Sequence, residues 1–362
     1  MNLTVVIPNR NRNLATVKRT LGSIAVQLNE QVQVVVVDYG SDVTYQKEFQ
    51  AYTDSLEKVH LMLCPTQGQL WQKTRAINIA LKQCDTPYFM VADMDMLFHP
   101  DFVQKIQKHL HPAEVTYFNV GILTEEESII EKPFDEYEVK FYTNEEATGM
   151  TLFPTAILKE INGFDEFYHG WGSEDTDVHV RLRHKGIPVH FNQEEVLLLH
   201  QWHPKFYRSK ESTAPYHHTL ERVNFEYIKL SRKHKKTQVN THQDWGILPS
   251  VDAYVALNQP TEKITCVSTL NAITAFCFQL DEGVWADEVI QLVVQPHPEE
   301  KTFKTSVKKA LQKRTPQFIS LEEANSKLLE TIIGKHRNRP YHYSFDRNAA
   351  TIVCTMNLLS SL

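Results

Sequence analysis

The sequence lacks the features that mark several protein classes. Its five cysteines are odd in number and no two have the spacing of a metal-binding pair, which argues against a disulfide scaffold and a zinc ribbon. No apolar run approaches the roughly 20 residues of a membrane-spanning helix, and the N-terminus lacks the basic start and long apolar core of a signal peptide. We therefore expect a soluble, cytoplasmic protein.

An excess of positive charge is also missing. Lys and Arg total 38 against 44 Asp and Glu, which gives a net charge of −6. Because binding along a phosphate backbone needs a cationic surface, nucleic acid is not expected as the main partner. The 42% of hydrophobic residues is too high for a disordered chain, and 362 residues suggest about two domains.

The first third of the chain alternates strand-like and helix-like segments. Four apolar, largely β-branched runs have the length of buried strands: Leu3 to Ile7, Val32 to Val37, Val59 to Leu63 and Tyr88 to Ala92. Residues 13–27 and 71–82 have apolar positions at helical spacing. This order predicts an α/β fold with a mostly parallel sheet flanked by helices, whose ligands bind at the carboxyl ends of the strands.

The last third of the chain predicts a smaller α+β domain of unknown role. Three segments are typical of strands: Ile264 to Leu270, Ala275 to Leu280 and Val289 to Val294. Two segments are typical of amphipathic helices: Phe303 to Lys313 and Leu321 to Ile333. We expect a first domain over residues 1–236 and this second domain over residues 244–362.

The sequence Asp93-Met94-Asp95 closes the fourth predicted strand. Two carboxylates at i and i+2 on a strand point the same way, and burying both is costly unless a cation accompanies them. Carboxylate oxygens suit Mg²⁺ or Mn²⁺. Alternatively, Asp95 or Asp101 caps a helix over residues 102–110.

A second acidic stretch runs from Gly170 to Asp177 and reads Gly-Trp-Gly-Ser-Glu-Asp-Thr-Asp. Carboxylates in the first turn of a helix are favoured by its dipole, which is a structural explanation for Glu174 and Asp175. Helix capping does not explain Trp171 between two glycines. A Trp on a loop beside a carboxylate suits a sugar ring, with the carboxylate accepting a hydroxyl proton.

The run His200-Gln201-Trp202-His203 follows another apolar segment. Here His200 is either a metal ligand or an ordinary hydrogen-bonded histidine. The basic stretch from Gln201 to Tyr216 is either a loop that closes over a diphosphate or a plain surface loop.

Together these segments resemble the GT-A glycosyltransferases, specifically family 2 enzymes and the catalytic domain of the β-1,4-galactosyltransferases. The resemblance covers residues 1 to 230 in consistent order. It rests on the P-x-R-x-R opening at 8–12, the donor-site helix at 73–80, the D-x-D motif at 93–95, and an acceptor-side block at 148–165 and 170–175. Family 2 chains commonly have Asp-Asp-Gly-Ser or Asp-Asn-Gly-Ser after the second strand, whereas this chain has Asp38-Tyr39-Gly40-Ser41 and a single carboxylate.

The resemblance implies a Rossmann-like GT-A fold, a UDP-sugar donor, a carbohydrate acceptor and Mn²⁺ (or Mg²⁺). The implied nucleotide-sugar contacts are Pro8, Arg10, Arg12, Asp38, Arg75, Asn78, Asp93, Met94 and Trp171. The implied metal ligands are Asp95 and His200, with Asp93 contacting ribose or metal and His203 as the alternative histidine. Asp175 is the implied general base, and Glu174 positions the acceptor.

The implied reaction is inverting transfer of a hexosyl or N-acetylhexosaminyl group, because one carboxylate takes the base position and no nucleophile is evident. By analogy, the expected setting is surface or capsular polysaccharide synthesis, with peripheral association with a membrane or with assembly enzymes. One alternative is a sugar-1-phosphate nucleotidyltransferase, which needs a Gly-rich N-terminal loop that residues 8–12 lack. Another is a non-catalytic carbohydrate-binding protein on the same fold.

Overall fold

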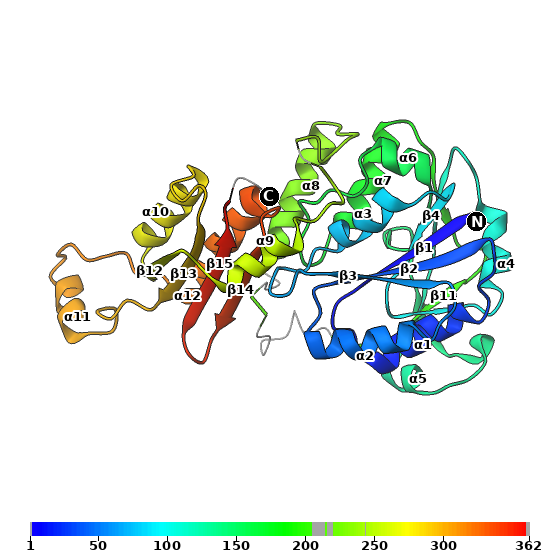
Figure 1. Ribbon diagram of the computed structural model, residues 1–362, viewed down its shortest axis with the longest axis horizontal. Coiled ribbons are helices and arrows are strands. Elements are labelled where there is room, and N and C mark those ends of the chain that lie inside the picture. The colour runs from blue at the N-terminus through cyan, green and yellow to red at the C-terminus, as the bar shows by residue number, and fades with distance from the viewer. Residues whose placement is uncertain (1, 205–213, 216–219, 243, 360–362) are drawn as a thin grey trace. The chain divides into compact units, whose positions relative to one another are not determined.

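The structure is a computed structural model that describes residues 2–204, 214–215, 220–242 and 244–359. The chain divides into two compact units (Figure 1). Among the described residues, unit 1 comprises 2–64, 71–204, 224–242 and 244–247, and unit 2 comprises 65–70, 214–215, 220–223 and 248–359. Unit 2 thus includes a short segment from the first third of the chain, which no local sequence signal marks.

Unit 1 is built on a seven-stranded sheet of order β10-β6-β9-β4-β1-β2-β3. Its strands are β1 (Leu3–Asn9), β2 (Val32–Tyr39), β3 (Val59–Cys64), β4 (Tyr88–Val91), β6 (Val115–Phe118), β9 (Thr151–Pro154) and β10 (Val189–Asn192). Strands β1 to β4 pair in parallel, whereas β9 is antiparallel to β4 and β6. The predicted α/β fold with a mostly parallel sheet is confirmed.

The helices that accompany this sheet follow the spacing of apolar residues. They are α1 (Leu14–Ala25), α2 (Val43–Thr53), α3 (Lys73–Gln83), α4 (Phe102–Ile106), α5 (Glu125–Ile129), α6 (Thr155–Glu160), α7 (Glu174–His184) and α8 (Glu221–Lys233). In α1, the side chain of Asn13 accepts hydrogen bonds from the first turn, and Val17, Leu21 and Ile24 are buried. Because these positions lie on one helical face, the sequence fixes both the start of α1 and its buried side.

A second sheet in unit 1 has the order β5-β11-β7-β8. Its strands are β5 (Met96–Phe98), β7 (Gly121–Leu123), β8 (Val139–Tyr142) and β11 (Leu198–His200). Strands β5 and β11 are antiparallel, with His200 opposite Met96, and the backbone N–H of Gln201 donates to the carbonyl of Asp95 at 2.8 Å. This pairing places the end of the D-x-D motif beside a segment about a hundred residues later in the chain.

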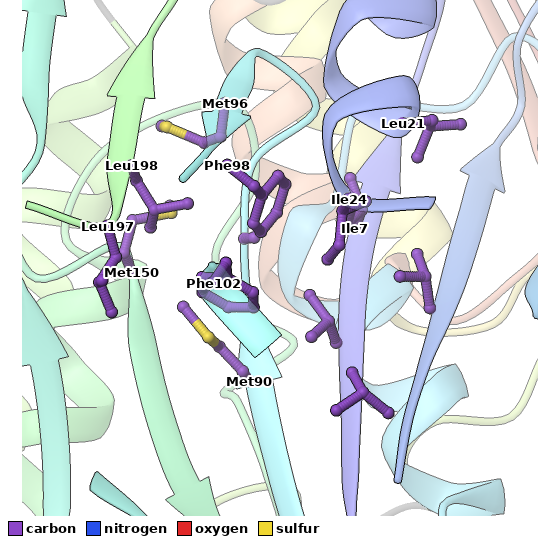
Figure 2. Packing of buried hydrophobic residues seen from close by; sticks show 14 of the residues in the cluster. Ile7, Leu21, Ile24, Met90, Met96, Phe98, Phe102, Met150, Leu197 and Leu198 are labelled. Atoms are coloured by element: carbon purple, nitrogen blue, oxygen red, sulfur yellow. The ribbon is translucent and has the colours of Figure 1, made fainter. Parts of the chain in front are cut away.

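The two short strands are anchored in the apolar core of unit 1. Figure 2 shows Ile7 of β1, Phe98 of β5 and Leu198 of β11 in the same cluster of buried side chains. The rings of Phe98 and Phe102 meet edge to face, with centroids 4.9 Å apart. Since close-packed interiors resist displacement, the residues next to these strands are held in fixed positions.

Unit 2 contains a four-stranded sheet of order β12-β13-β15-β14. Its strands are β12 (Glu262–Val267), β13 (Val289–Gln295), β14 (Tyr341–Asp346) and β15 (Thr351–Asn357), and its helices are α9 (Val251–Val255), α10 (Leu270–Asp281), α11 (Phe303–Ala310) and α12 (Leu321–Thr331). Strands β12 and β13 are parallel, and β15 is antiparallel to β13 and β14. The predicted smaller α+β part is confirmed.

One predicted strand of unit 2 is wrong. The segment Ala275 to Leu280 lies within helix α10. The side chain of Thr269 accepts a hydrogen bond at the helix start, and the buried residues Ile273, Phe276 and Leu280 share one helical face. A short apolar run does not by itself distinguish a helix from a strand, because which of its residues are buried depends on the neighbours it packs against.

None of the described helices combines the length and the apolar character needed to cross a membrane.

Candidate functional site

A cluster of three side chains forms where β5 and β11 meet. Nε2 of His200 lies 3.6 Å from Oδ1 of Asp95, and Nε2 of His203 lies 3.2 Å from Oδ2 of the same carboxylate. One ligand atom of each residue lies within 4.8 Å of the others. We call this the Asp95 cluster.

The Asp95 carboxylate is buried but surrounded by positive or protonatable groups. Nη2 of Arg12 lies 3.0 Å from its Oδ2. Burial raises the pKa of Asp95. His200, His203 and Arg12 together lower it by more than burial raises it, so the pKa lies well below its usual range. The carboxylate therefore stays ionised at any physiological pH.

The donor set of the Asp95 cluster fits a divalent cation. Oδ1 of Asp95 is buried and has no hydrogen-bonding partner among the described residues. A buried anionic oxygen in that position costs free energy unless a ligand or ion contacts it. One carboxylate oxygen and two imidazole nitrogens are ligands that divalent transition metals accept.

A second cluster is organised around Lys73, the first residue of α3. Its Nζ lies 3.0 Å from Oδ1 of Asp93, 3.1 Å from Oδ2 of Asp175 and 3.9 Å from Oε1 of Glu174. Burial lowers the pKa of Lys73, but the three carboxylates raise it well above its usual value. The lysine is a fixed cation that connects the D-x-D motif to the first turn of α7, and we call this group the Asp175 cluster.

Asp175 has the surroundings of a proton acceptor. Burial raises its pKa to about 8; Lys73 opposes this shift, and Glu174 and Asp93 add to it. Its Oδ2 accepts a hydrogen bond from Lys73, whereas its Oδ1 is buried without a hydrogen-bonding partner among the described residues. A carboxylate with one oxygen held and the other unpartnered can receive a proton from a bound hydroxyl.

The loop before α7 exposes the indole of Trp171, which is 47% accessible. The next two residues, Gly172 and Ser173, have φ angles of +103° and +73°. A φ of +103° strongly favours glycine, so the turn after the tryptophan depends on Gly172. Nδ2 of Asn224 donates to the carbonyl of Trp171 at 3.1 Å, which ties this loop to α8.

Several residues expected to contact the nucleotide lie at the carboxyl ends of β1 and β2. Pro8 is buried in β1, and Arg10 follows it half-buried. Asp38 is fully buried, and both of its oxygens accept hydrogen bonds, from Asn9, from Ser41 and from Gln46. In this structure Asp38 fixes the turn after β2, and its contact with a nucleotide stays a prediction.

Arg75 and Asn78 are buried in α3 and bind Glu166. Nε of Arg75 donates to Glu166 at 2.9 Å, and Nδ2 of Asn78 donates to the same carboxylate at 3.0 Å. Oδ1 of Asn78 accepts from Phe164, beside Gly163, where a Cβ atom would lie 2.3 Å from that oxygen. The structure thus gives both residues a part in holding the turn after α6, and their contact with a donor sugar stays a prediction.

Met94 lies in the apolar core at 2% exposure, and its carbonyl accepts a hydrogen bond from Thr20. Its side chain belongs to the apolar core, so its contact with a nucleotide sugar stays a prediction. The basic stretch expected to close over a diphosphate lies mostly outside the described residues, because Lys205, Tyr207, Arg208 and Lys210 are not among them.

The structure brings together residues from five places in the sequence. Of the predicted site residues, the two clusters contain Asp93, Asp95, Glu174, Asp175, His200 and His203, and Arg12 contacts the Asp95 cluster. The fifth place is Lys73. Lys73 begins the predicted donor-site helix, but its contact with the three carboxylates was not predicted, although a signal for it exists. A cation at the N-terminus of a helix is disfavoured by the helix dipole, so Lys73 needs carboxylates nearby.

Comparison with known proteins bears on this arrangement. Residues 4–155 match the family model described as glycosyl transferase family 2, and residues 130–200 match the model described as the N-terminal domain of galactosyltransferase. Residues 4–200 are thus similar to glycosyltransferase domains. The predicted resemblance to family 2 glycosyltransferases and to galactosyltransferases is confirmed.

Curated glycosyltransferases resemble part of the chain. Chondroitin sulfate synthase 3 of Homo sapiens is 23% identical over 188 residues, which cover 48% of this chain and 21% of that protein. Validoxylamine A glucosyltransferase of Streptomyces hygroscopicus subsp. limoneus is 26% identical over 230 residues, which cover 53% of this chain and 50% of that protein. This chain therefore matches half or less of the length of these relatives.

Among solved structures, S. aureus TarS in complex with UDP aligns with a TM-score of 0.43 and 18% identity, covering 65% of this chain and 68% of that chain.

Proposed function

We propose that the protein is an inverting, metal-dependent glycosyltransferase that moves a sugar from a UDP-sugar to a hydroxyl group of a carbohydrate acceptor. One arrangement carries the proposal: the Asp95 cluster suits a cation, and Asp93, two residues before Asp95, contacts Lys73. Lys73 also holds Oδ2 of Asp175, whose Oδ1 has no hydrogen-bonding partner among the described residues. A cation that neutralises a leaving diphosphate and a base that activates an acceptor are the two requirements of sugar transfer.

Asp95, His200 and His203 would hold the metal. Two imidazole nitrogens favour Mn²⁺ over Mg²⁺, because Mg²⁺ prefers oxygen ligands. When bound, the metal offsets the negative charge that grows on the diphosphate as the anomeric bond breaks. Arg12 contacts Oδ2 of Asp95 and keeps that carboxylate oriented.

Asp175 would act on the acceptor. Its Oδ1 receives the hydroxyl proton, while Lys73 holds Oδ2 and so fixes the plane of the carboxylate. The acceptor oxygen attacks the face of the sugar opposite the diphosphate, and this single displacement inverts the anomeric centre. Trp171, which is exposed on the adjoining loop, offers an apolar face to a sugar ring.

One curated relative is named as a glucosyltransferase, which supports a hexosyl donor, and an N-acetylhexosaminyl donor is the alternative. We place the reaction in surface or capsular polysaccharide synthesis on the cytoplasmic side of the membrane. A panel of UDP-sugars, assayed for Mn²⁺-dependent hydrolysis, would name the sugar.

Calorimetry with UDP tests the proposal. We expect Mn²⁺ to tighten UDP binding at least about tenfold in the native chain. Asp95→Asn should abolish this dependence, while Asp101→Asn, a matched change at a nearby exposed aspartate, should keep it. UDP binding that is equally strong with and without Mn²⁺ would overturn the metal-dependent mechanism.

A further inference from the structure

Helix α11 of unit 2 carries an exposed apolar stripe. Phe303 is 85% exposed, Val307 38% and Leu311 60%. Leu311 follows the last helical residue, and its N–H donates to the carbonyl of Val307 at 3.0 Å, so the helical path continues to it. Side chains four residues apart lie above one another on a helix, so the three form one continuous face.

A polar residue on the opposite side of α11 is buried. Thr305 is 2% exposed, although it is a polar residue on the side of the helix away from the stripe. A helix that packs on a protein in water normally buries its apolar face and exposes its polar one. Here the orientation is reversed, and Figure 1 draws α11 apart from the sheet of its own unit.

Positive charge surrounds the stripe. Residues 301–314 contain six Lys and Arg residues and no Asp or Glu, on a chain whose net charge is −6. Lys301, Lys304, Lys313 and Arg314 are exposed. The Lys304 ammonium lies 3.9 Å from Glu299. Because exposed contacts of this kind contribute little, the positive charge of the segment is available to an external anion.

We propose that α11 docks the protein on an anionic membrane surface. Phe303, Val307 and Leu311 enter the boundary between headgroups and acyl chains, and the surrounding lysines pair with anionic headgroups. A soluble acidic polymer would use the same cations but would leave the stripe in water. The combination of stripe and charge therefore favours a lipid surface. This inference goes beyond the proposed transfer reaction and does not depend on it.

Vesicle sedimentation with the full chain tests the proposal. We expect binding to vesicles that contain phosphatidylglycerol, at least about tenfold weaker binding to pure phosphatidylcholine, and weakening by salt. Phe303→Ser with Leu311→Ser should reduce binding to the anionic vesicles at least about tenfold. Lys304→Glu with Lys308→Glu should do the same, since each cation near such a surface contributes about fivefold.

Two changes on the same unit serve as controls. Phe278→Ser removes a side chain that is 64% exposed on α10, and Lys263→Glu reverses an exposed charge on β12. Both should bind vesicles like the native chain, and circular dichroism should show all variants folded. Sugar transfer to a soluble acceptor should be unchanged in the Phe303/Leu311 variant. Failure of the membrane proposal can therefore be distinguished from failure of the proposed function.

The proposal is overturned if the Phe303/Leu311 variant binds anionic vesicles as tightly as the native chain. It is equally overturned if native protein ignores vesicles but binds a soluble acidic polysaccharide, with the same affinity in that variant. The second result would assign α11 to a polyanion instead of a membrane.

Discussion

The Asp95 cluster and the Asp175 cluster both contain a buried carboxylate, but their surroundings move the two pKa values in opposite directions. Asp95 faces two imidazoles and a guanidinium, which hold its pKa below the usual range against the effect of burial. Asp175 shares a single lysine with two other carboxylates, and burial raises its pKa to about 8. One carboxylate is thereby suited to holding a cation and the other to accepting a proton.

A third buried carboxylate shows what a structural role looks like. Both oxygens of Asp177 are satisfied, Oδ2 by Nε of Arg181 at 2.7 Å and Oδ1 by the hydroxyl of Ser231 at 2.6 Å. Asp95 and Asp175 each keep one buried oxygen without a hydrogen-bonding partner among the described residues. Buried carboxylates that a structure leaves incompletely bonded are therefore the candidates for chemistry.

The largest effect is expected for Asp95→Asn. Loss of the anionic ligand should lower the transfer rate by about ten-thousandfold, because the metal supplies several kcal/mol of charge stabilisation. Initial rates with a UDP-sugar measure this. A chelator should cause a similar loss in the native chain, restored by Mn²⁺, and Asp101→Asn should remain active. Full Mn²⁺-dependent activity in Asp95→Asn would remove that residue from the metal site.

Asp175→Asn should lower the turnover rate by about a hundred- to a thousandfold, as expected for loss of a general base. Because the residue acts on the acceptor, the affinity for UDP with Mn²⁺ should change by less than about twofold. Rate and calorimetry together make the measurement. A large loss of UDP affinity would mean that Asp175 belongs to the donor side.

The pH dependence of the native enzyme should follow the raised pKa of Asp175. A base must be ionised to act, so the rate should rise with pH through about 8 and increase about tenfold between pH 7 and pH 9. Residual activity of Asp175→Asn should lack this rise. A flat native profile over the same range would contradict the assignment.

Lys73→Met should have a smaller effect on the turnover rate, about five- to tenfold, because it releases Oδ2 of Asp175 without removing the base. It should also move the rise in rate to higher pH, since Lys73 lowers the pKa of Asp175. Lys73→Arg keeps the charge and should show a smaller pH shift. An unchanged pH profile in Lys73→Met would show that the lysine does not control the base.

Asp177→Asn should have the smallest effect on transfer, within about twofold, and the largest on stability. It leaves the fully buried Arg181 without its charged partner, which should lower the free energy of unfolding by about 3–5 kcal/mol. Denaturant unfolding checks the stability, and the rate at low temperature checks the activity. A catalytic defect in a folded Asp177→Asn protein would contradict the purely structural role of Asp177.

Local patterns predicted much of unit 1 correctly. The β-branched runs became β1 to β4, and the apolar spacing after Asn13 became α1. The prediction of a strand at Ala275 failed because the apolar content of the run did not show which residues are buried. The buried residues have helical spacing. The hairpin of β14 and β15 was not predicted. Its strands pair with each other, and β15 also pairs with β13.

By itself, the sequence determined the elements and the chemistry at their ends: an apolar strand that runs into Asp93-Met94-Asp95 and a helix that opens with Glu174 and Asp175. Such features depend on neighbouring residues only. Tertiary structure decided that β11 pairs with β5, so that two histidines reach Asp95, and that Lys73 lies among three carboxylates. Contacts between residues far apart in the chain, and the burial that shifts their pKa values, arise only when the chain is folded.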